Sequence, residues 1–253
     1  MNALDVRGLS IAFGGVKAIQ DLSFDVHQGT VHAIIGPNGA GKTTLINLVT
    51  GIYAPDSGSI ELFGQEVAGT APERLARAGL GRTFQNLQVC MNMSAVDNVM
   101  IGAHLSLASS LFAGMLRTPS LRLADAACRD RALELMAFVG VAQYATSDAS
   151  QMPYGALKRL EIARALAASP KLLLMDEPAA GLNHTETAEI ETLIRRIAET
   201  GTTVVLVEHD MKLIMGVSDR ILVLHYGKRL ALGTTQEVRS HPDVISAYLG
   251  AEA

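Results

Sequence analysis

A glycine-rich stretch at positions 36–43 has the residue types and spacing of a phosphate-binding loop. Glycines let the backbone approach an anion closely, so that main-chain N–H groups and the start of a following helix face the phosphate oxygens. Lys42 adds a positive charge near the β- and γ-phosphates, and the hydroxyl of Thr43 suits Mg²⁺. We therefore expect a nucleotide to bind here. The expected contacts are Gly36, Pro37, Asn38, Gly39, Ala40, Gly41, Lys42, Thr43 and Thr44.

Two adjacent carboxylates, Asp176 and Glu177, follow an apolar stretch at 172–175 and precede Pro178, which stops a strand. Ligands of doubly wound α/β folds bind at the carboxyl ends of the strands, where this pair would lie. Asp176 is expected to hold Mg²⁺, directly or through water, and Glu177 to orient or deprotonate an attacking water. Alone, the pair would indicate a simple turn at a strand end. The phosphate loop upstream favours the catalytic interpretation.

Strands and helices must alternate to bring these motifs together. The stretch 30–35 predicts a strand before the loop, and 42–49 predicts a helix that Gly51 ends. Continuous apolar strands at 172–175 and 202–207 are typical of a parallel sheet buried on both faces. A stripe of apolar residues at helical spacing predicts a helix between these two strands. The stripe consists of Ile190, Leu193, Ile194 and Ile197.

The start and the middle of the chain have different patterns. A turn at Gly14 and alternation over 22–26 predict an antiparallel hairpin, whereas 86–168 is mainly helical. One helix face in that middle part carries Ala132, Leu135, Met136 and Val139. We predict one α/β domain, 1–253, with a parallel-sheet core, an N-terminal antiparallel β-subdomain and an inserted helical subdomain. The expected boundaries are 1–85 and 165–235 for the core, about 86–164 for the helical subdomain and 236–253 for a C-terminal tail.

The composition excludes several classes of protein. A formal net charge of −4 gives no basic stripe, so nucleic acid is not an expected partner and any phosphate binding must be local. The two cysteines, Cys90 and Cys128, have no Cys-x-x-Cys spacing, which argues against a zinc site or a disulfide framework. Asp5 and Arg7 precede any apolar run, a pattern that does not fit a secretory signal.

The stretch 99–116 has no charged residue and approaches the length of a membrane span. Interior serines, glycines and His104 disfavour a span, because polar groups in lipid need partners. We expect a helix followed by a loop, whose apolar, serine-bearing surface could dock onto a membrane protein.

With both motifs in place, the chain resembles the ATP-binding-cassette (ABC) ATPase family over nearly its whole length, which implies a P-loop NTPase core of the RecA-like type. Gln85 matches the glutamine that senses metal and nucleotide in this family and links them to the transmembrane partner. His209 matches the switch histidine that contacts the γ-phosphate. Each match is weak alone, because a lone glutamine is usually a surface residue and a lone histidine after a strand usually caps a helix. The loop that crosses the dimer interface in the family is matched by Ala180, Gly181, Leu182 and Asn183.

Two further parts of the resemblance are less direct: one residue has an alternative role, and one motif departs from the family pattern. Phe13 matches the aromatic residue that stacks on adenine, although an alternating strand also needs core aromatics. Pro153, Tyr154 and Gly155 occupy the signature position that contacts the partner's nucleotide, but they depart from the usual Leu-Ser-Gly-Gly-Gln. Proline has neither a hydroxyl nor an N–H, so this signature offers fewer donors to a γ-phosphate. We therefore expect two unequal ATP sites in a paired assembly.

Several stretches look like the ATPase subunits of importers for hydrophobic, branched-chain amino acids. They are 81–86, 97–100, 179–183, 207–211 and 247–250. Tyr154, Gly155 and the stretch 106–117, which is uncharged up to its last residue, Arg117, also resemble the larger of that importer's two ATPase subunits. The resemblance implies ATP and Mg²⁺ as cofactors and a peripheral location at the cytoplasmic face of the cell (inner) membrane. It also implies a second, non-identical ATPase subunit, two transmembrane permease subunits and, indirectly, a substrate-binding protein.

Alternative functions stay open at this point. Importers of urea, amides or aromatic acids and lipopolysaccharide exporters share the cassette, which does not itself touch the substrate. A soluble cassette acting on DNA or ribosomes is disfavoured by the acidic charge and by the lack of a coiled-coil arm. A regulatory module without catalysis would be expected to lack Glu177 or His209, and both are present.

Overall fold

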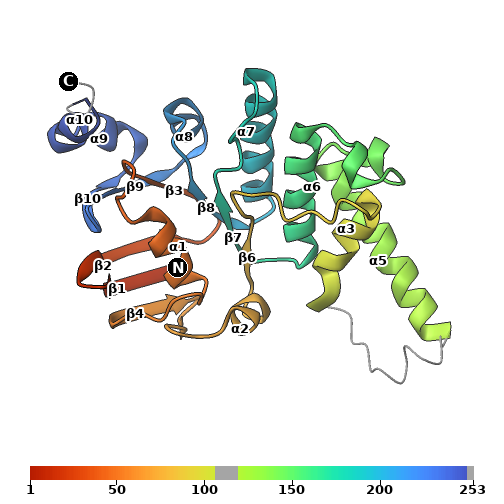
Figure 1. Ribbon diagram of the computed structural model, residues 1–253, viewed down its shortest axis with the longest axis horizontal. Helices are drawn as coiled ribbons and strands as arrows, with labels where there is room; N and C mark the ends of the chain where they lie inside the picture. Colours follow the sequence, from red (N-terminus) through yellow and green to blue (C-terminus); the bar gives the residue numbers. More distant parts are fainter. Residues whose placement is uncertain (106–118, 250–253) are drawn as a thin grey trace.

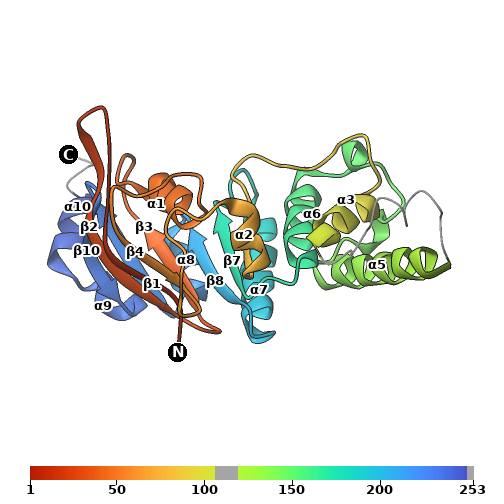
Figure 2. The same ribbon diagram turned by 90° about the horizontal axis from the view of Figure 1, so that it is seen from below.

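The computed structural model describes residues 1–105 and 119–249. It contains a four-stranded sheet, a six-stranded sheet and a group of helices at one end of the molecule (Figures 1 and 2). Two stretches used in the family resemblance are affected. All of 106–117 lies outside the described residues, and so does residue 250, the last of the stretch 247–250. No helix within the described ranges is long and apolar enough to cross a membrane.

The four-stranded sheet is antiparallel, with the order β2-β1-β4-β5. Its strands are β1 (Asn2–Phe13), β2 (Val16–His27), β4 (Ser57–Leu62) and β5 (Gln65–Glu66). Gly14 and Gly15, at φ 53° and 86°, form the turn between β1 and β2, a conformation that glycine adopts without strain. The hairpin predicted from the alternation is therefore confirmed.

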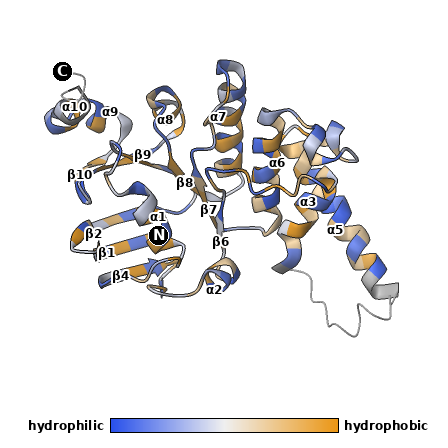
Figure 3. Ribbon diagram, viewed as in Figure 1, coloured by the Kyte–Doolittle hydropathy of each residue, from blue (hydrophilic) through white to orange (hydrophobic). Residues whose placement is uncertain are grey.

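The six-stranded sheet has the order β10-β9-β3-β8-β7-β6, in which only β10 is antiparallel to its neighbour. Its strands are β3 (Val31–Ile35), β6 (Leu80–Arg82), β7 (Leu172–Asp176), β8 (Thr203–Val207), β9 (Arg220–His225) and β10 (Lys228–Gly233). Every residue of β3, β7 and β8 is buried, as the continuous apolar runs predicted. Figure 3 shows these central strands as mainly hydrophobic.

Helices cover this sheet and extend beyond it. They are α1 (Lys42–Val49), α2 (Pro72–Arg77), α7 (His184–Glu199), α8 (Met211–Val217), α9 (Thr235–Arg239) and α10 (Pro242–Leu249). The predicted stripe of α7, from Ile190 to Ile197, is buried, and Gly201 follows the helix in the left-handed region. The helix after the phosphate loop begins at Lys42, as predicted.

The helical group lies at the far end from the antiparallel sheet (Figures 1 and 2). It comprises α3 (Ala95–Gly102), η1 (Ala103–Leu105), α5 (Pro119–Phe138), η2 (Ala142–Tyr144), η3 (Ala149–Gln151) and α6 (Tyr154–Ala167). The predicted face of α5 is buried, and it packs in one hydrophobic cluster with α3, α6 and α7. The subdomain boundaries stay predictions; α6 itself continues to Ala167.

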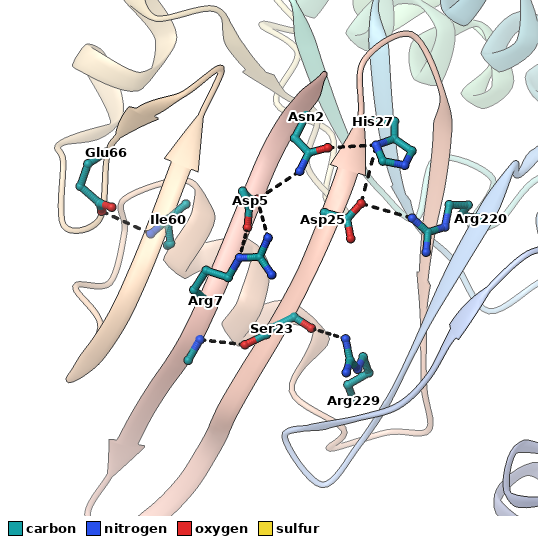
Figure 4. A network of polar contacts seen from close by, with 11 residues as sticks. Asn2, Asp5, Arg7, Ser23, Asp25, His27, Ile60, Glu66, Arg220 and Arg229 are labelled. Carbon is teal, nitrogen blue, oxygen red and sulfur yellow. Dashed lines mark hydrogen bonds and ion pairs between the residues drawn. The ribbon is translucent and has the colours of Figure 1, made fainter.

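Polar contacts between strands join the two sheets (Figure 4). Arg220, at the start of β9, forms an ion pair of 3.2 Å with Asp25 of β2. Arg229 of β10 donates a hydrogen bond of 2.9 Å to the carbonyl of Ser23. Both contacts link the β1–β2 hairpin to strands of the large sheet.

Leu193 provides a test of this packing. It is 4% exposed within the cluster on α7, so replacement by alanine removes buried apolar surface and leaves a cavity. We expect Leu193→Ala to lower the free energy of unfolding by about 3 kcal/mol in urea titrations. The control is Leu123→Ala, because Leu123 is 72% exposed on α5. Equal losses in the two variants would contradict the observed packing.

Candidate active site

The phosphate loop joins β3 to α1 and is supported from behind by the turn between β9 and β10. Gly227 in that turn donates a backbone hydrogen bond of 3.0 Å to the carbonyl of Ala40. A side chain at Gly36 would collide with the carbonyl oxygen of Leu224, and one at Gly41 with that of Ala18. Glycine at these two positions therefore lets the loop pack tightly against its neighbours.

The interior of the loop is suited to an anion. The ammonium of Lys42 donates to the carbonyls of Gly36, at 2.6 Å, and Pro37, at 3.1 Å. Burial lowers the pKa of Lys42, and the carboxylates of Glu177 and Asp176 oppose that shift. No side chain among the described residues caps the first turn of α1, so its N–H groups are available to a ligand. A phosphate group fits this lysine and helix end.

Asp176 ends β7 in a largely buried position. Burial raises the pKa of its carboxyl group, and the guanidinium of Arg82 at 3.2 Å opposes this change. Arg82 also donates to the side chains of Asn47, at 2.9 Å, and Thr50, at 3.1 Å. This arginine was not assigned a role from the sequence. Arg82 is the third residue of β6, and nothing in the neighbouring sequence indicates that it contacts Asp176, ninety-four positions away.

Glu177 lies at the centre of a contact group formed by three separate segments. Its backbone is in the left-handed region, at φ 50°, an unfavourable conformation for a non-glycine residue that is typical of functional sites. Its Oε2 accepts a hydrogen bond of 2.9 Å from the side-chain amide of Gln85. Its Oε1 lies 3.9 Å from Nδ1 of His209, which is 69% exposed. The three predicted catalytic residues therefore lie together.

Glu208 holds two of these segments in place. It is 2% exposed, and its carboxylate accepts hydrogen bonds from the backbone N–H of Ala179, at 2.9 Å, and of His209, at 3.0 Å. It therefore ties the loop after β7 to the loop after β8. Glu208 was not assigned a role from the sequence, although a carboxylate directly after a buried strand was an available signal.

The predicted metal ligands fit a nucleotide-bound Mg²⁺. Thr43, Gln85 and Asp176 offer oxygen atoms, which is the donor type that Mg²⁺ prefers. The amide nitrogen of Gln85 is engaged by Glu177, so its oxygen is the atom available to a metal. Within the described ranges, no cluster of three or more His, Cys, Asp or Glu residues could hold a metal alone. A Mg²⁺ here would need phosphate oxygens and water to complete its ligands.

The sequence of this chain is similar to those of known proteins. A profile described as ABC transporter matches residues 19–180, and one described as branched-chain amino acid ATP-binding cassette transporter matches residues 228–253. The high-affinity branched-chain amino acid transport ATP-binding protein LivG of Escherichia coli is 44% identical over 248 residues, covering 98% of this chain and 97% of LivG. The chain belongs to the ABC transporter family. BraF of Pseudomonas aeruginosa, which has the same description, is 42% identical over 248 residues, covering 98% of this chain and 97% of BraF.

A solved ABC cassette has the same fold. The structure described as the ADP conformation of MJ1267, an ATP-binding cassette of an ABC transporter, matches with a TM-score of 0.85 and 28% identity over 99% of each chain. The predicted P-loop NTPase fold is therefore confirmed, as is the family resemblance. The chain is an ATP-binding cassette of a transporter ATPase.

The predicted signature residues lie at the start of α6. Pro153 is the N-cap and gives no side-chain cap, and Tyr154 is 45% exposed. A side chain at Gly155 would collide with the carboxylate of Glu186 on α7. The predicted dimer loop is adjacent, because Gly181 packs against the Tyr154 ring. The structure therefore places the residues of the predicted signature next to those of the predicted dimer loop.

The end of the dimer loop also starts α7. The side chain of Asn183 accepts hydrogen bonds from the backbone of Thr185, at 2.9 Å, and Glu186, at 3.0 Å. The Glu186 side chain accepts one from the backbone of Asn183, at 3.0 Å, which completes a capping box. Asn183 therefore has a structural role whether or not it meets a second cassette.

Phe13 lies at the tip of the β1–β2 hairpin and is 44% exposed. Its ring packs edge-on against Tyr53, with centroids 5.2 Å apart. Phe24, by contrast, is 1% exposed and fills the core of the same sheet. An exposed face on Phe13 is compatible with stacking on a base.

The ion pair between Arg82 and Asp176 gives a testable prediction. Arg82→Met leaves a buried carboxylate without its cation, which we expect to lower the free energy of unfolding by about 3 kcal/mol at about pH 8. A carboxyl group with a raised pKa in the folded state stabilises the protein at low pH and loses that effect as the pH rises through the folded pKa. The loss relative to the unaltered chain should therefore shrink at about pH 5.

Urea unfolding of Arg82→Met at both pH values measures this effect. Adding Asp176→Asn should restore part of the lost stability, because it removes the unpaired charge. A loss that is independent of pH and unchanged in the double variant would contradict the ion pair as its cause.

Proposed function

We propose that this cassette hydrolyses ATP to energise an importer of branched-chain or other hydrophobic amino acids. LivG and BraF are described as branched-chain amino acid transport proteins, and the profile at 228–253 carries the same description. The cassette lies far from any transported molecule, so the substrate follows only from family association. Import of urea, amides or aromatic acids and export of lipopolysaccharide are the alternatives.

The convergence of Gln85, Glu177 and His209 beside the Lys42 loop is the observation that carries the proposed chemistry. In the proposed reaction, the glycine-rich loop and Lys42 hold the phosphates, and the exposed face of Phe13 stacks on adenine. Glu177 orients a water and accepts its proton as the water attacks the γ-phosphorus, while His209 contacts the γ-phosphate. Mg²⁺ held at Thr43, Gln85 and Asp176 would supply positive charge to the phosphates.

A second cassette completes each site. The dimer loop, residues 180–183, faces the partner, and the N-terminus of α6 is directed at the partner's nucleotide. Pro153 offers that nucleotide neither a hydroxyl nor an N–H, whereas the free N–H groups of the first turn of α6 remain. The site served by this signature is therefore the weaker of two, which fits a non-identical partner subunit.

An apolar groove beside Gln85 is the proposed docking surface for a permease subunit. It has a volume of about 350 Å³ and separates α2 and β6 from α3 and α6. Ile52 and Phe84, which line it, are 50% and 40% exposed. Phe84 precedes Gln85, so a permease helix in this groove would sense the position of the catalytic glutamine. The cassette would then lie peripherally at the cytoplasmic face of the inner membrane, below two permease subunits and, indirectly, a substrate-binding protein.

Glu177→Gln tests the proposed base. The amide keeps the size of the side chain but cannot accept a proton, so we expect steady-state ATPase activity to fall by a factor of about a thousand. ATP binding should persist, and size-exclusion chromatography should show an ATP-dependent dimer of this cassette with the second ATPase subunit. Turnover at the normal rate in this variant would exclude Glu177 as the base.

Ile52→Glu tests the proposed permease surface. A charge in the groove should weaken association with permease-containing membranes at least about tenfold, because it must be desolvated on docking. Ile245→Glu is the matched control, since Ile245 is 42% exposed on α10, outside the groove. Co-sedimentation measures both variants, and ATP binding should be unchanged in each. Equal retention of the two would argue against docking in this groove.

A further inference from the structure

Three charged residues on one face of the signature helix α6 point at the segment that carries Gln85. They recur at intervals of three residues, at Lys158, Glu161 and Arg164. Lys158 is 2% exposed and Glu161 is 5% exposed, although both are charged residue types that are almost never fully buried without partners. Their burial therefore calls for a specific set of contacts.

All three side chains contact the backbone of one short loop, residues 84–88. The ammonium of Lys158 donates to the carbonyl of Gln85 at 3.1 Å. One oxygen of Glu161 accepts from the N–H groups of Phe84, at 3.4 Å, and Gln88, at 3.3 Å, and Arg164 donates to the carbonyl of Gln88. Side chains of α6 thus bind both N–H groups and carbonyl groups of this loop.

Lys158 differs from the other two because it reaches a second catalytic segment. Its ammonium lies 3.5 Å from the carbonyl oxygen of Glu177, and 5.9 Å from the centroid of the Tyr154 ring. It also interacts electrostatically with the carboxylates of Asp176 and Glu161. A single buried cation therefore joins the Gln85 loop, the end of β7 and the first turn of the signature helix.

We infer that Lys158 is a positioning residue for hydrolysis, which sets the place of Gln85 relative to Glu177 by holding both backbone carbonyls. The inference rests on the proposed roles of Gln85 and Glu177. The 2.9 Å hydrogen bond between these side chains spans ninety-two positions of the sequence, and Lys158 connects their backbones directly. Charge-assisted hydrogen bonds in a low-dielectric site are strong enough to define such a geometry.

The test uses Lys158→Gln and Lys158→Arg in the full chain assembled with its membrane partners. Lys158→Gln removes the charge, so kcat for ATP hydrolysis should fall about tenfold or more while KM for ATP stays within about twofold. Lys158→Arg keeps a cation that can donate to two carbonyls, and it should recover a large part of kcat. The matched control is Lys171→Gln, because Lys171 is an exposed lysine beside Phe63, and its kcat should match that of the unaltered chain.

A double-variant cycle separates positioning from general support of the fold. If Lys158 acts through Gln85, then Lys158→Gln should cost little further kcat in a Gln85→Ala background. Independent, multiplicative losses in the double variant would overturn the inference. So would a kcat of Lys158→Gln within about twofold of the unaltered chain, or a loss that Lys158→Arg does not recover. If the glutamine variant fails to fold, the cycle is run with Lys158→Met, which removes the charge and both hydrogen bonds but keeps an unbranched side chain of similar size.

Failure of the underlying proposal has a different signature. If Glu177→Gln retained full ATPase activity, the assigned base would be wrong and the proposed function would fail with it. If Glu177→Gln is inactive and Lys158→Gln is fully active, only the positioning role of Lys158 is refuted.

Discussion

The burial of charge at the carboxyl ends of β3, β7 and β8 is the constraint on which the rest of this structure depends. A charged group removed from water needs a partner or a set of hydrogen bonds. Lys42 meets this need with loop carbonyls, Asp176 with Arg82, and Glu208 with backbone N–H groups. Arg82 and Ala179 lie on other segments than the carboxylates they contact, so the strands and the loops that follow them must be in place together.

The same constraint explains how the cassette could respond to a nucleotide. Phosphate oxygens can replace the carbonyls that Lys42 now contacts, and a metal can compete for the oxygen atoms near Asp176. Gln85 donates to Glu177, so a ligand that engages the glutamine also changes what the carboxylate contacts. The Gln85 loop is held by α6 and borders the proposed permease groove, so such a change would affect both the proposed signature and that groove.

Much of the fold could be predicted from sequence because its signals are local. The all-apolar strands β7 and β8, the stripe of α7 and the glycine-rich loop each depend on neighbouring residues. The contacts of Arg82 with Asp176, of Lys158 with Gln85 and of Glu161 with Phe84 could not be predicted, because each joins residues more than seventy positions apart. The exposure of Phe13 was also undetermined, since strand alternation is equally consistent with a core aromatic.

The central claim is that ATP is held and hydrolysed at the loop that contains Lys42. It is tested most directly by measuring phosphate release from ATP by the assembled transporter with unaltered chain and with Lys42→Met in its place. The account predicts that ATP binding at this cassette is lost and that its share of hydrolysis disappears, because the methionine cannot neutralise the phosphates. Phosphate release and ATP affinity equal to those of the unaltered transporter would contradict it.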